Sequence, residues 1–320
     1  MALEYSGLGR IGVLMGGPSS EREISLKSGK SVFDALRQIG VNCVAINIVN
    51  DDRDENIELI KLQGIDCAFL ALHGHFGEDG SIQEILDTLE VPYTGSNSLA
   101  SKLAMDKIAS KQVLEICGIP VPGYQVIDKL VYNKNWKPEA KFSFPLIVKP
   151  AGNGSSIGLS IVDRNDELGK AIELAFQYDE KVLVEEFIFG RELTVGILAD
   201  KALPVIEIVP KHRFFDYAAK YQAGLTDYII PAHLDSNIAA LVQETALKVH
   251  RFLGCSGCSR VDIILSNDNR PYVLELNSIP GMTPMSLVPK AVKVLGMDFP
   301  QFCIKLIELA YEKAEIQAAS

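Results

Sequence analysis

Three features are missing from this chain of 320 residues: a long apolar run, an excess of positive charge and a cysteine framework. Without a run of about twenty apolar residues, no membrane-spanning helix is expected. The net charge of −10 argues against a nucleic-acid partner, because proteins of that class are typically basic. The six cysteines follow no framework spacing, and the first residues lack the pattern of a secretory signal. We therefore expect reduced thiols and a cytoplasmic location.

Internal repeats and low-complexity stretches are also absent, and the composition is that of a folded protein. A hydrophobic content of 48% excludes general disorder. The length exceeds one ordinary hydrophobic core and predicts two or three subdomains. Because the chain is negative overall, a phosphate-bearing ligand would need positive charge gathered locally. Lysines and arginines inside motifs therefore carry more information than the total.

The first hundred residues alternate between short apolar strands and helical patterns, which predicts a small doubly wound α/β domain with a parallel sheet. After it, a Pro/Gly cluster at 119–123 ends a helix and marks a boundary. The rhythm then changes to strand–loop–strand with interspersed helices, an α+β pattern. The expected strands are 10–14, 41–49, 67–72, 144–149, 159–162, 182–186, 193–198, 260–265 and 271–277. The expected helices are 20–39, 101–118, 166–175, 238–253 and 299–314. The predicted domains are 1–103, 104–190 and 191–320.

Three local motifs resemble known sites but lack the required context. The G-x-G-x-x-G at 7–12 precedes the first strand, whereas a dinucleotide fingerprint must follow one. The Gly-Lys-Ser at 29–31 falls inside a predicted helix and lacks the upstream glycine of a P-loop. Cys255 and Cys258 form a lone C-x-x-C with no second pair to complete a zinc site.

The strongest chemical signal is a predicted hairpin of two apolar strands around a polar turn at 266–270. Folding the hairpin places Asp262 nearly opposite Glu275, and Asn277 shares a face with Glu275. Two carboxylates so close repel unless a cation lies between them. Carboxylate and amide oxygens suit Mg²⁺ held together with phosphate. A solvated hairpin face would give the same pattern, but Asp262 interrupts an otherwise apolar strand.

Two further motifs favour a nucleotide. Lys149 ends a strand and a Gly/Ser loop follows to Gly158, which lets backbone N–H groups approach a phosphate closely. An acidic pair, Glu185 and Glu186, ends another strand, and Glu192 opens the next. A glutamate can accept hydrogen bonds from ribose hydroxyls, and backbone groups between apolar neighbours suit an adenine edge.

Two glycine-containing loops are candidates for binding a small substrate. The loop at 16–23 joins the first strand to its helix, so its amides suit an anion and Glu21 suits an ammonium group. The loop at 281–286 follows the acidic hairpin and offers amides to a carboxylate or oxyanion. Either loop alone would also serve as a plain helix cap.

Taken jointly, these motifs resemble the D-alanine–D-alanine ligase family of the ATP-grasp superfamily, in order, from about residue 10 to 312. The matching segments are 16–25, 73–80, 93–96, 105–107, 149–158, 216–221, 260–262 and 277–283. The resemblance implies a doubly wound pre-ATP-grasp domain followed by an ATP-grasp fold of two subdomains. It also implies that ATP phosphorylates the carboxylate of one D-alanine and that the amine of a second attacks the acyl phosphate. The product serves peptidoglycan synthesis.

The resemblance also implies residue roles. ATP would be bound by Lys107, Lys149, Glu185, Glu186, Ile188 and Glu192, and two Mg²⁺ or Mn²⁺ ions by Asp262, Glu275 and Asn277. The catalytic set would be Glu21, Ser155, Tyr221, Arg260 and Gly281, with His73, Lys220 and Ser286 binding substrate. Within it, Glu21, Ser155 and Tyr221 would form a latch that closes the 214–231 loop and excludes water. Arg260 and the Gly281 amide would stabilise the oxyanion.

Alternatives with the same fold differ in product. Tyr221 accompanies dipeptide formation in the family, whereas phenylalanine there tends to accompany D-alanyl-D-lactate formation, and neither residue decides about D-serine. Met285 and Glu186 depart from residues common in relatives, which affects second-substrate and adenine contacts. A nucleotide-binding protein without catalysis is a third reading, disfavoured by the complete set of ligands. The family further implies a homodimer.

Overall fold

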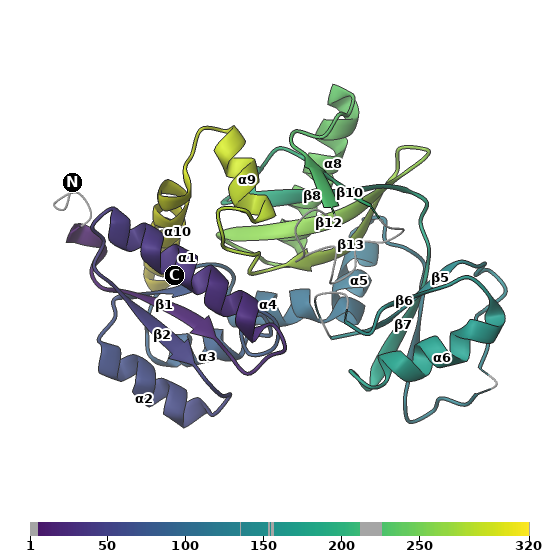
Figure 1. Ribbon diagram of the computed structural model, residues 1–320, viewed down its shortest axis with the longest axis horizontal. Helices are drawn as coiled ribbons and strands as arrows, with labels where there is room; N and C mark the ends of the chain where they lie inside the picture. Colours follow the sequence, from purple (N-terminus) through teal and green to yellow (C-terminus); the bar gives the residue numbers. More distant parts are fainter. Residues whose placement is uncertain (1–5, 135, 153, 155–156, 212–225, 320) are drawn as a thin grey trace.

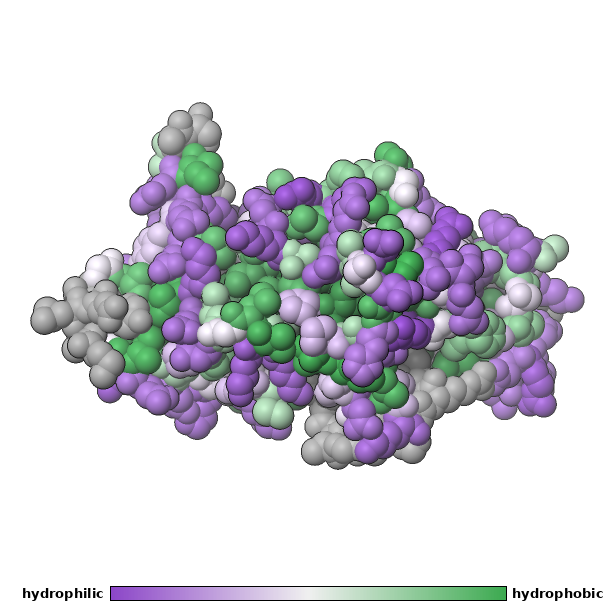
Figure 2. Space-filling model, turned by 90° about the horizontal axis from the view of Figure 1, so that it is seen from above, coloured by the Kyte–Doolittle hydropathy of each residue, from purple (hydrophilic) through white to green (hydrophobic). Residues whose placement is uncertain are grey.

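The structure is a computed structural model that describes residues 6–134, 136–152, 154, 157–211 and 226–319. Three β-sheets built from successive stretches of the chain form its framework (Figure 1). Within the described residues, no helix combines the length and apolar character needed to cross a bilayer. Hydrophilic residues cover much of the face seen from above, with apolar residues among them (Figure 2).

The first sheet is parallel, with strand order β2-β1-β3. Its elements are η1 (Ser6–Leu8), β1 (Ile11–Gly16), α1 (Arg22–Gln38), β2 (Cys43–Ile48), α2 (Arg53–Gln63), β3 (Cys67–Leu70) and α3 (Ser81–Thr88). Every residue of β1 is buried, because helices cover both faces of the sheet. Ile11 and Val13 pack on the side of α1, whereas Leu14 packs on the side of α2 and α3. The predicted doubly wound domain is confirmed.

The second sheet is antiparallel, with strand order β4-β7-β5-β6. Its elements are β4 (Tyr124–Asp128), β5 (Leu146–Pro150), β6 (Ser160–Val162), α6 (Asn165–Ala175) and β7 (Lys181–Glu186). Alternation along the strands separates two faces: Val148 and Val184 pack in the core beneath α6, whereas Lys149 and Glu185 turn to the opposite side. This second face points toward the third sheet.

The third sheet has six strands in the order β11-β10-β8-β12-β13, with β9 paired to β8. Its elements are β8 (Gly190–Leu198), β9 (Lys201–Ala202), β10 (Ile206–Pro210), β11 (Thr226–Ile229), α8 (Ser236–Phe252), β12 (Cys258–Ser266) and β13 (Pro271–Asn277). Val195, Val261 and Ile263 face α8 in the core. The alternate residues Thr194 and Asp262 therefore face the second sheet.

Four helices connect these layers: α4 (Ser98–Met105), α5 (Lys107–Ile116), α9 (Leu287–Val294) and α10 (Phe299–Ala319). The final helix α10 returns to pack against α1 and β3 of the first sheet (Figure 1). The prediction of one helix over 101–118 was wrong, because Asp106 divides it. Asp106 has an extended backbone, and its carboxylate caps α5 by accepting from Ile108 N and Ala109 N.

The look-alike motifs fall where the sequence predicts. The G-x-G-x-x-G at 7–12 precedes β1 and overlaps only its first two residues. Residues 29–31 lie inside α1. Cys255 and Cys258 are buried, free thiols.

Candidate active site

Two cavities meet at the junction of the three sheets. The loop cavity, about 370 Å³, is lined by the start of α1, the segment after β3 and the segment after β13. The sheet cavity, about 560 Å³, lies between the second and third sheets. Lys107 and Glu275 line both cavities, so a group bound in one can touch a group bound in the other. Both volumes fall within the usual range for small-molecule sites.

The acidic hairpin lies at this junction. Asp262 on β12 pairs with Glu275 on β13, as the sequence predicts, and Arg260 pairs with Asn277. A bulge between Asp262 and Ile263 is needed for this register. The ladder from the turn pairs Ile263 with Val273, which continued regularly would set Asp262 opposite Leu274. The extra residue shifts the pairing and brings the two carboxylates together.

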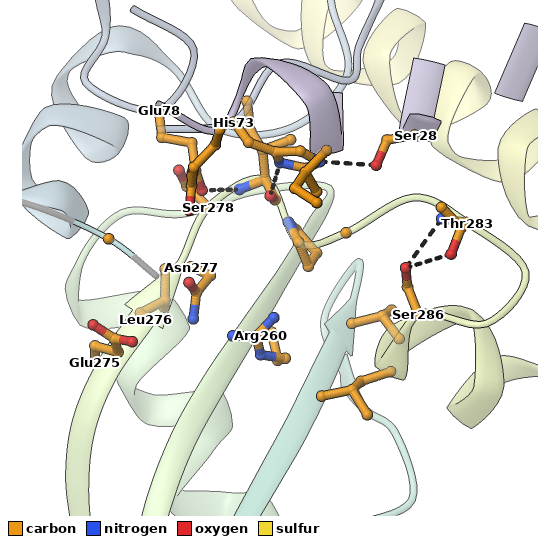
Figure 3. A pocket seen from close by; sticks show the side chains of 18 of the residues that line it. Ser28, His73, Glu78, Arg260, Glu275, Leu276, Asn277, Ser278, Thr283 and Ser286 are labelled. Carbon is orange, nitrogen blue, oxygen red and sulfur yellow. Dashed lines mark hydrogen bonds between the residues drawn. The ribbon is translucent and has the colours of Figure 1, made fainter. Parts of the chain in front are cut away.

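Asp262 is buried and held by three side chains. Arg260 donates two hydrogen bonds to it, both of 2.8 Å, from Nε and Nη2. Thr194 on β8 donates to Asp262 Oδ1 at 2.6 Å, and Asn277 Nδ2 donates to Oδ2 at 3.1 Å. This network fixes the position and orientation of the carboxylate before any ligand binds. Figure 3 shows Arg260, Glu275 and Asn277 side by side beneath the loop cavity.

Positive charge gathers on the other side of the junction, in a protein that is negative overall. Lys107 Nζ lies 3.4 Å from Glu275, and Lys149 Nζ lies 2.9 Å from Glu185. Lys111, which the sequence analysis missed, lies 3.2 Å from Glu185 and is buried, without the alignment of a hydrogen bond. Burial raises the pKa of Glu185, but the charges of the two lysines together lower it by more, so the net shift is downward. Burial lowers the pKa of Lys111 to about 8.

The rest of the sheet cavity is lined by the segment that connects the second and third sheets. Glu186, Ile188 and Glu192 line it, together with Ile147 and Leu274. Glu186 accepts from Gly123 N at 3.1 Å, and its own N–H donates to Gly123 O at 2.8 Å. The cavity therefore combines apolar walls with carboxylates and lysines, of which Lys107 and Lys149 each lie against a carboxylate.

The loop cavity brings together the predicted substrate residues Glu21, His73, Gly281 and Ser286. Glu21 is buried at the start of α1. The Gly74 backbone passes so close that an added Cβ would lie 3.0 Å from Glu21 Oε2. Ser286 Oγ accepts from Thr283 N at 3.1 Å (Figure 3).

A second carboxylate, Glu78, lies beside this cavity and was not assigned a role from the sequence. Burial and, after it, the nearby charge of Glu21 raise the pKa of Glu78 to about 8, against the opposing effect of hydrogen bonds from Gly74 and Ile279. This electrostatic environment favours a cationic ligand. Ser155, Lys220 and Tyr221 lie outside the described residues. Thr194, Lys111 and Ser28 were also missed, because each acts only through a neighbour in space.

Comparison with known proteins was made on the whole chain. The family model described as the D-ala D-ala ligase C-terminus matches residues 113–308, and that for the N-terminus matches 49–96. The D-alanine–D-alanine ligase of Geotalea uraniireducens is 46% identical over 94% of this chain and 95% of its own length. That of Pelotomaculum thermopropionicum is 43% identical, covering 96% and 98%.

Solved structures of the same family resemble this chain over nearly its whole length. A crystal structure of D-alanine–D-alanine ligase from Bacillus anthracis superposes with a TM-score of 0.87 and 38% identity, over 97% of this chain and 99% of that one. The same enzyme complexed with ATP gives 0.85 and 35%, with the same coverage.

The two antiparallel sheets and these likenesses place the chain in the ATP-grasp class of ligases. Within that class, the chain belongs to the D-alanine–D-alanine ligase family, whose members make D-alanyl-D-alanine for peptidoglycan. The fold, family and ligase class predicted from the motifs are confirmed.

Proposed function

We propose that the sheet cavity binds ATP, that the loop cavity binds two D-alanines, and that they react where the cavities meet. The observation that carries this proposal is the sharing of Lys107 and Glu275 by both cavities. The terminal phosphate of a nucleotide in one cavity would there reach a carboxylate in the other. The ATP complex of the Bacillus anthracis enzyme, with the same overall fold, supports the nucleotide assignment.

In the sheet cavity, Lys107 and Lys149 would bind phosphate oxygens, and Glu192 the ribose hydroxyls. Glu185 would keep Lys149 in place, and Glu186 with the Ile188 backbone would face the base. The apolar lining of this cavity, which includes Ile147 and Leu274, supports an aromatic ring there.

A divalent cation fits the acidic hairpin by the chemistry of its donors. Asp262, Glu275 and Asn277 offer two carboxylates and an amide oxygen, which suit Mg²⁺ or Mn²⁺ and not a softer metal. The described residues hold no cluster of three histidine, cysteine or acidic side chains, so no competing site of that kind is present there. The resemblance to the family implies two such cations, and when bound they would neutralise phosphate charge.

In the loop cavity, Glu21 would hold the ammonium of the first D-alanine, with His73 in the wall beside it. Transfer of the terminal phosphoryl group to the carboxylate gives an acyl phosphate and ADP. The amine of the second D-alanine, positioned by Ser286 and Lys220, attacks the carbonyl carbon and expels phosphate. Arg260 and the Gly281 N–H would stabilise the negative oxygen that forms. The latch of Glu21, Ser155 and Tyr221 would exclude water meanwhile.

The assay follows ADP release and analyses the product with D-alanine, D-serine or D-lactate as second substrate. D-Alanine should give the dipeptide. Phosphate release without dipeptide would contradict the proposal, and nucleotide binding without turnover would favour a non-catalytic role.

Replacing Asp262 by Asn tests the cation site. It should cut turnover about a hundredfold or more through lost charge stabilisation and weaken the response to Mg²⁺. Asp268→Asn, in the exposed turn of the same hairpin, is the matched control and should behave as wild type. Near-normal turnover of Asp262→Asn would remove the metal assignment.

We also propose the domain limits 1–103, 104–190 and 191–320, a homodimer, and a reducing, cytoplasmic location. The six cysteines are free thiols, which supports a reducing location. Five of them are buried, and burial raises the pKa of Cys255 to about 11 and that of Cys258 to about 12, which disfavours the reactive thiolate.

A further inference from the structure

Three side chains that line or border the loop cavity tie the first domain to the segment 278–286, which joins β13 to α9. The first is Glu78. Its Oε2 accepts from Gly74 N at 2.8 Å, within its own loop, and its Oε1 accepts from Ile279 N at 3.2 Å, more than two hundred residues away in the sequence. Figure 3 shows this bond crossing from one domain to the other.

The second is His73, whose two ring nitrogens both have protein partners. Nδ1 lies 3.2 Å from the Ile279 carbonyl oxygen, and Nε2 lies 2.9 Å from Ser28 Oγ. A carbonyl oxygen can only accept a hydrogen bond, so Nδ1 must carry the hydrogen. In a neutral ring Nε2 is then an acceptor, and Ser28 donates to it.

The third is Ser28, which completes the direction of the network. Its Oγ accepts from Met282 N at 3.3 Å while its hydroxyl hydrogen goes to His73. The Ser28 hydroxyl therefore donates one hydrogen bond and accepts another, and the two do not compete. Both side chains are buried, with Ser28 fully enclosed. Burial also lowers the pKa of His73 to about 4, which agrees with a neutral ring.

These contacts bracket Gly281. Its neighbours Ile279 and Met282 are held by Glu78, His73 and Ser28, and Gly281 itself lies on the wall of the loop cavity. In the described part of the chain, the Gly281 N–H has no acceptor. The network therefore determines where this amide points.

We propose that Ser28, His73 and Glu78 are positioning residues that fix the Gly281 amide across the domain boundary, with His73 locked as the neutral Nδ1–H tautomer. His73 then acts through Ile279 and offers substrate only its ring carbons. The inference rests on the proposed role of Gly281 as an oxyanion donor, but the state of the ring can be measured without it.

The first test is the ¹⁵N spectrum of histidine-labelled protein, with the His73 signals assigned by their loss in His73→Asn. A protonated Nδ1 and an unprotonated Nε2 are expected from pH 5.5 to 8, unchanged on adding D-alanine. A hydrogen on Nε2, a doubly protonated ring in this range, or a tautomer change with D-alanine would overturn the proposal. This readout needs no catalysis.

The second test is Ser28→Ala, with Ser31→Ala as the matched control on the same helix. The Ser31 hydroxyl donates only to Lys27 O of its own helix. Ser28→Ala should lower kcat about tenfold, less than the hundredfold or more for outright loss of an oxyanion donor. The KM for the first D-alanine should stay within about twofold, since Glu21 is untouched.

Ser28→Cys keeps a weak donor of similar size and guards against a folding defect in the alanine variant. It should retain more kcat than Ser28→Ala at an equal melting temperature. A raised first-site KM with unchanged kcat would show that this region contacts substrate directly, against the proposal. If Ser28→Ala had the same kcat as Ser31→Ala in an enzyme that makes the dipeptide, the positioning role would be refuted while the proposed function would stand. If the wild type made no dipeptide, the proposed function would fail, whereas the spectrum would still test the tautomer.

Discussion

The buried lysine–glutamate cluster gives a stability prediction whose size can be worked out from the structure. Glu185 is only 2% exposed, with Lys149 Nζ at 2.9 Å and Lys111 Nζ at 3.2 Å. At an effective dielectric constant of about 20, each attraction amounts to about 5 kcal/mol. Desolvation of the carboxylate offsets several kcal/mol of that sum.

Glu185→Gln removes the carboxylate that both buried lysines face, and Lys111, whose pKa burial already lowers to about 8, loses the partner that favours its charged form. Breaking a buried pair in this way typically costs about 3–5 kcal/mol of unfolding free energy. At about 2 to 4 °C per kcal/mol, the melting temperature should fall by roughly 6 to 20 °C. The assay is thermal and urea unfolding without nucleotide at pH 7.5. Glu186→Gln, at the neighbouring half-buried position, is the control and should change little.

Adding Lys111→Met to Glu185→Gln should restore part of the lost stability, because it replaces a buried amine that has lost its carboxylate partner by an apolar chain of similar length. The pH dependence gives a further check. The pKa of Glu185 is lowered in the folded state, so its contribution is present above the ordinary value of 4.5 and lost as the pH falls. The gap between wild type and variant should narrow in acid. Equal stabilities at pH 7.5, or no rescue by Lys111→Met, would refute the reasoning.

Three further outcomes are expected. Tyr221→Phe should raise ester formation relative to peptide at neutral pH when D-lactate competes with D-alanine, and an unchanged product ratio would count against the latch. The folded-state pKa of Glu78 is raised to about 8, so its stabilising contribution is present below about 4.5 and lost as the pH rises through 8. Glu78→Gln should flatten the fall in unfolding free energy over that window, measured by urea titration, and an unchanged slope would be the contrary result. Gly281→Ala places a Cβ 3.0 Å from Ser286 Oγ and should lower turnover about tenfold with the fold retained, whereas Gly7→Ala, with open space around it, should not; equal activities would contradict the crowding argument.

Local pattern accounts for much of the architecture. Alternation in the strands around Val261 and Val184 encodes which side chains face a core and which face a cleft, because successive residues of a strand point to opposite faces. The acidic hairpin was predictable for the same reason, since a polar turn between two apolar strands determines approximate pairing. The helix break at Asp106 was not predicted, because an aspartate that caps one helix resembles one on the surface of a longer helix.

Other parts of the site depend on contacts between distant segments. The bulge beside Asp262, which brings it opposite Glu275, has no signature in the residues that form it. Lys111 reads as an ordinary surface lysine until β7 places Glu185 against it. Motif likeness supplied the expected latch roles of Ser155 and Tyr221, which lie outside the described residues.

The sequence by itself determined many of the strands and helices, the faces they bury and the family, because those properties reside in short-range periodicity and in motifs read in order. Only the tertiary structure decided the state of His73. Its tautomer follows from a carbonyl of Ile279 on one side and a hydroxyl of Ser28 on the other. Hydrogen-bond direction depends on which groups meet in space, and three separate segments of the chain must be packed together before those groups meet.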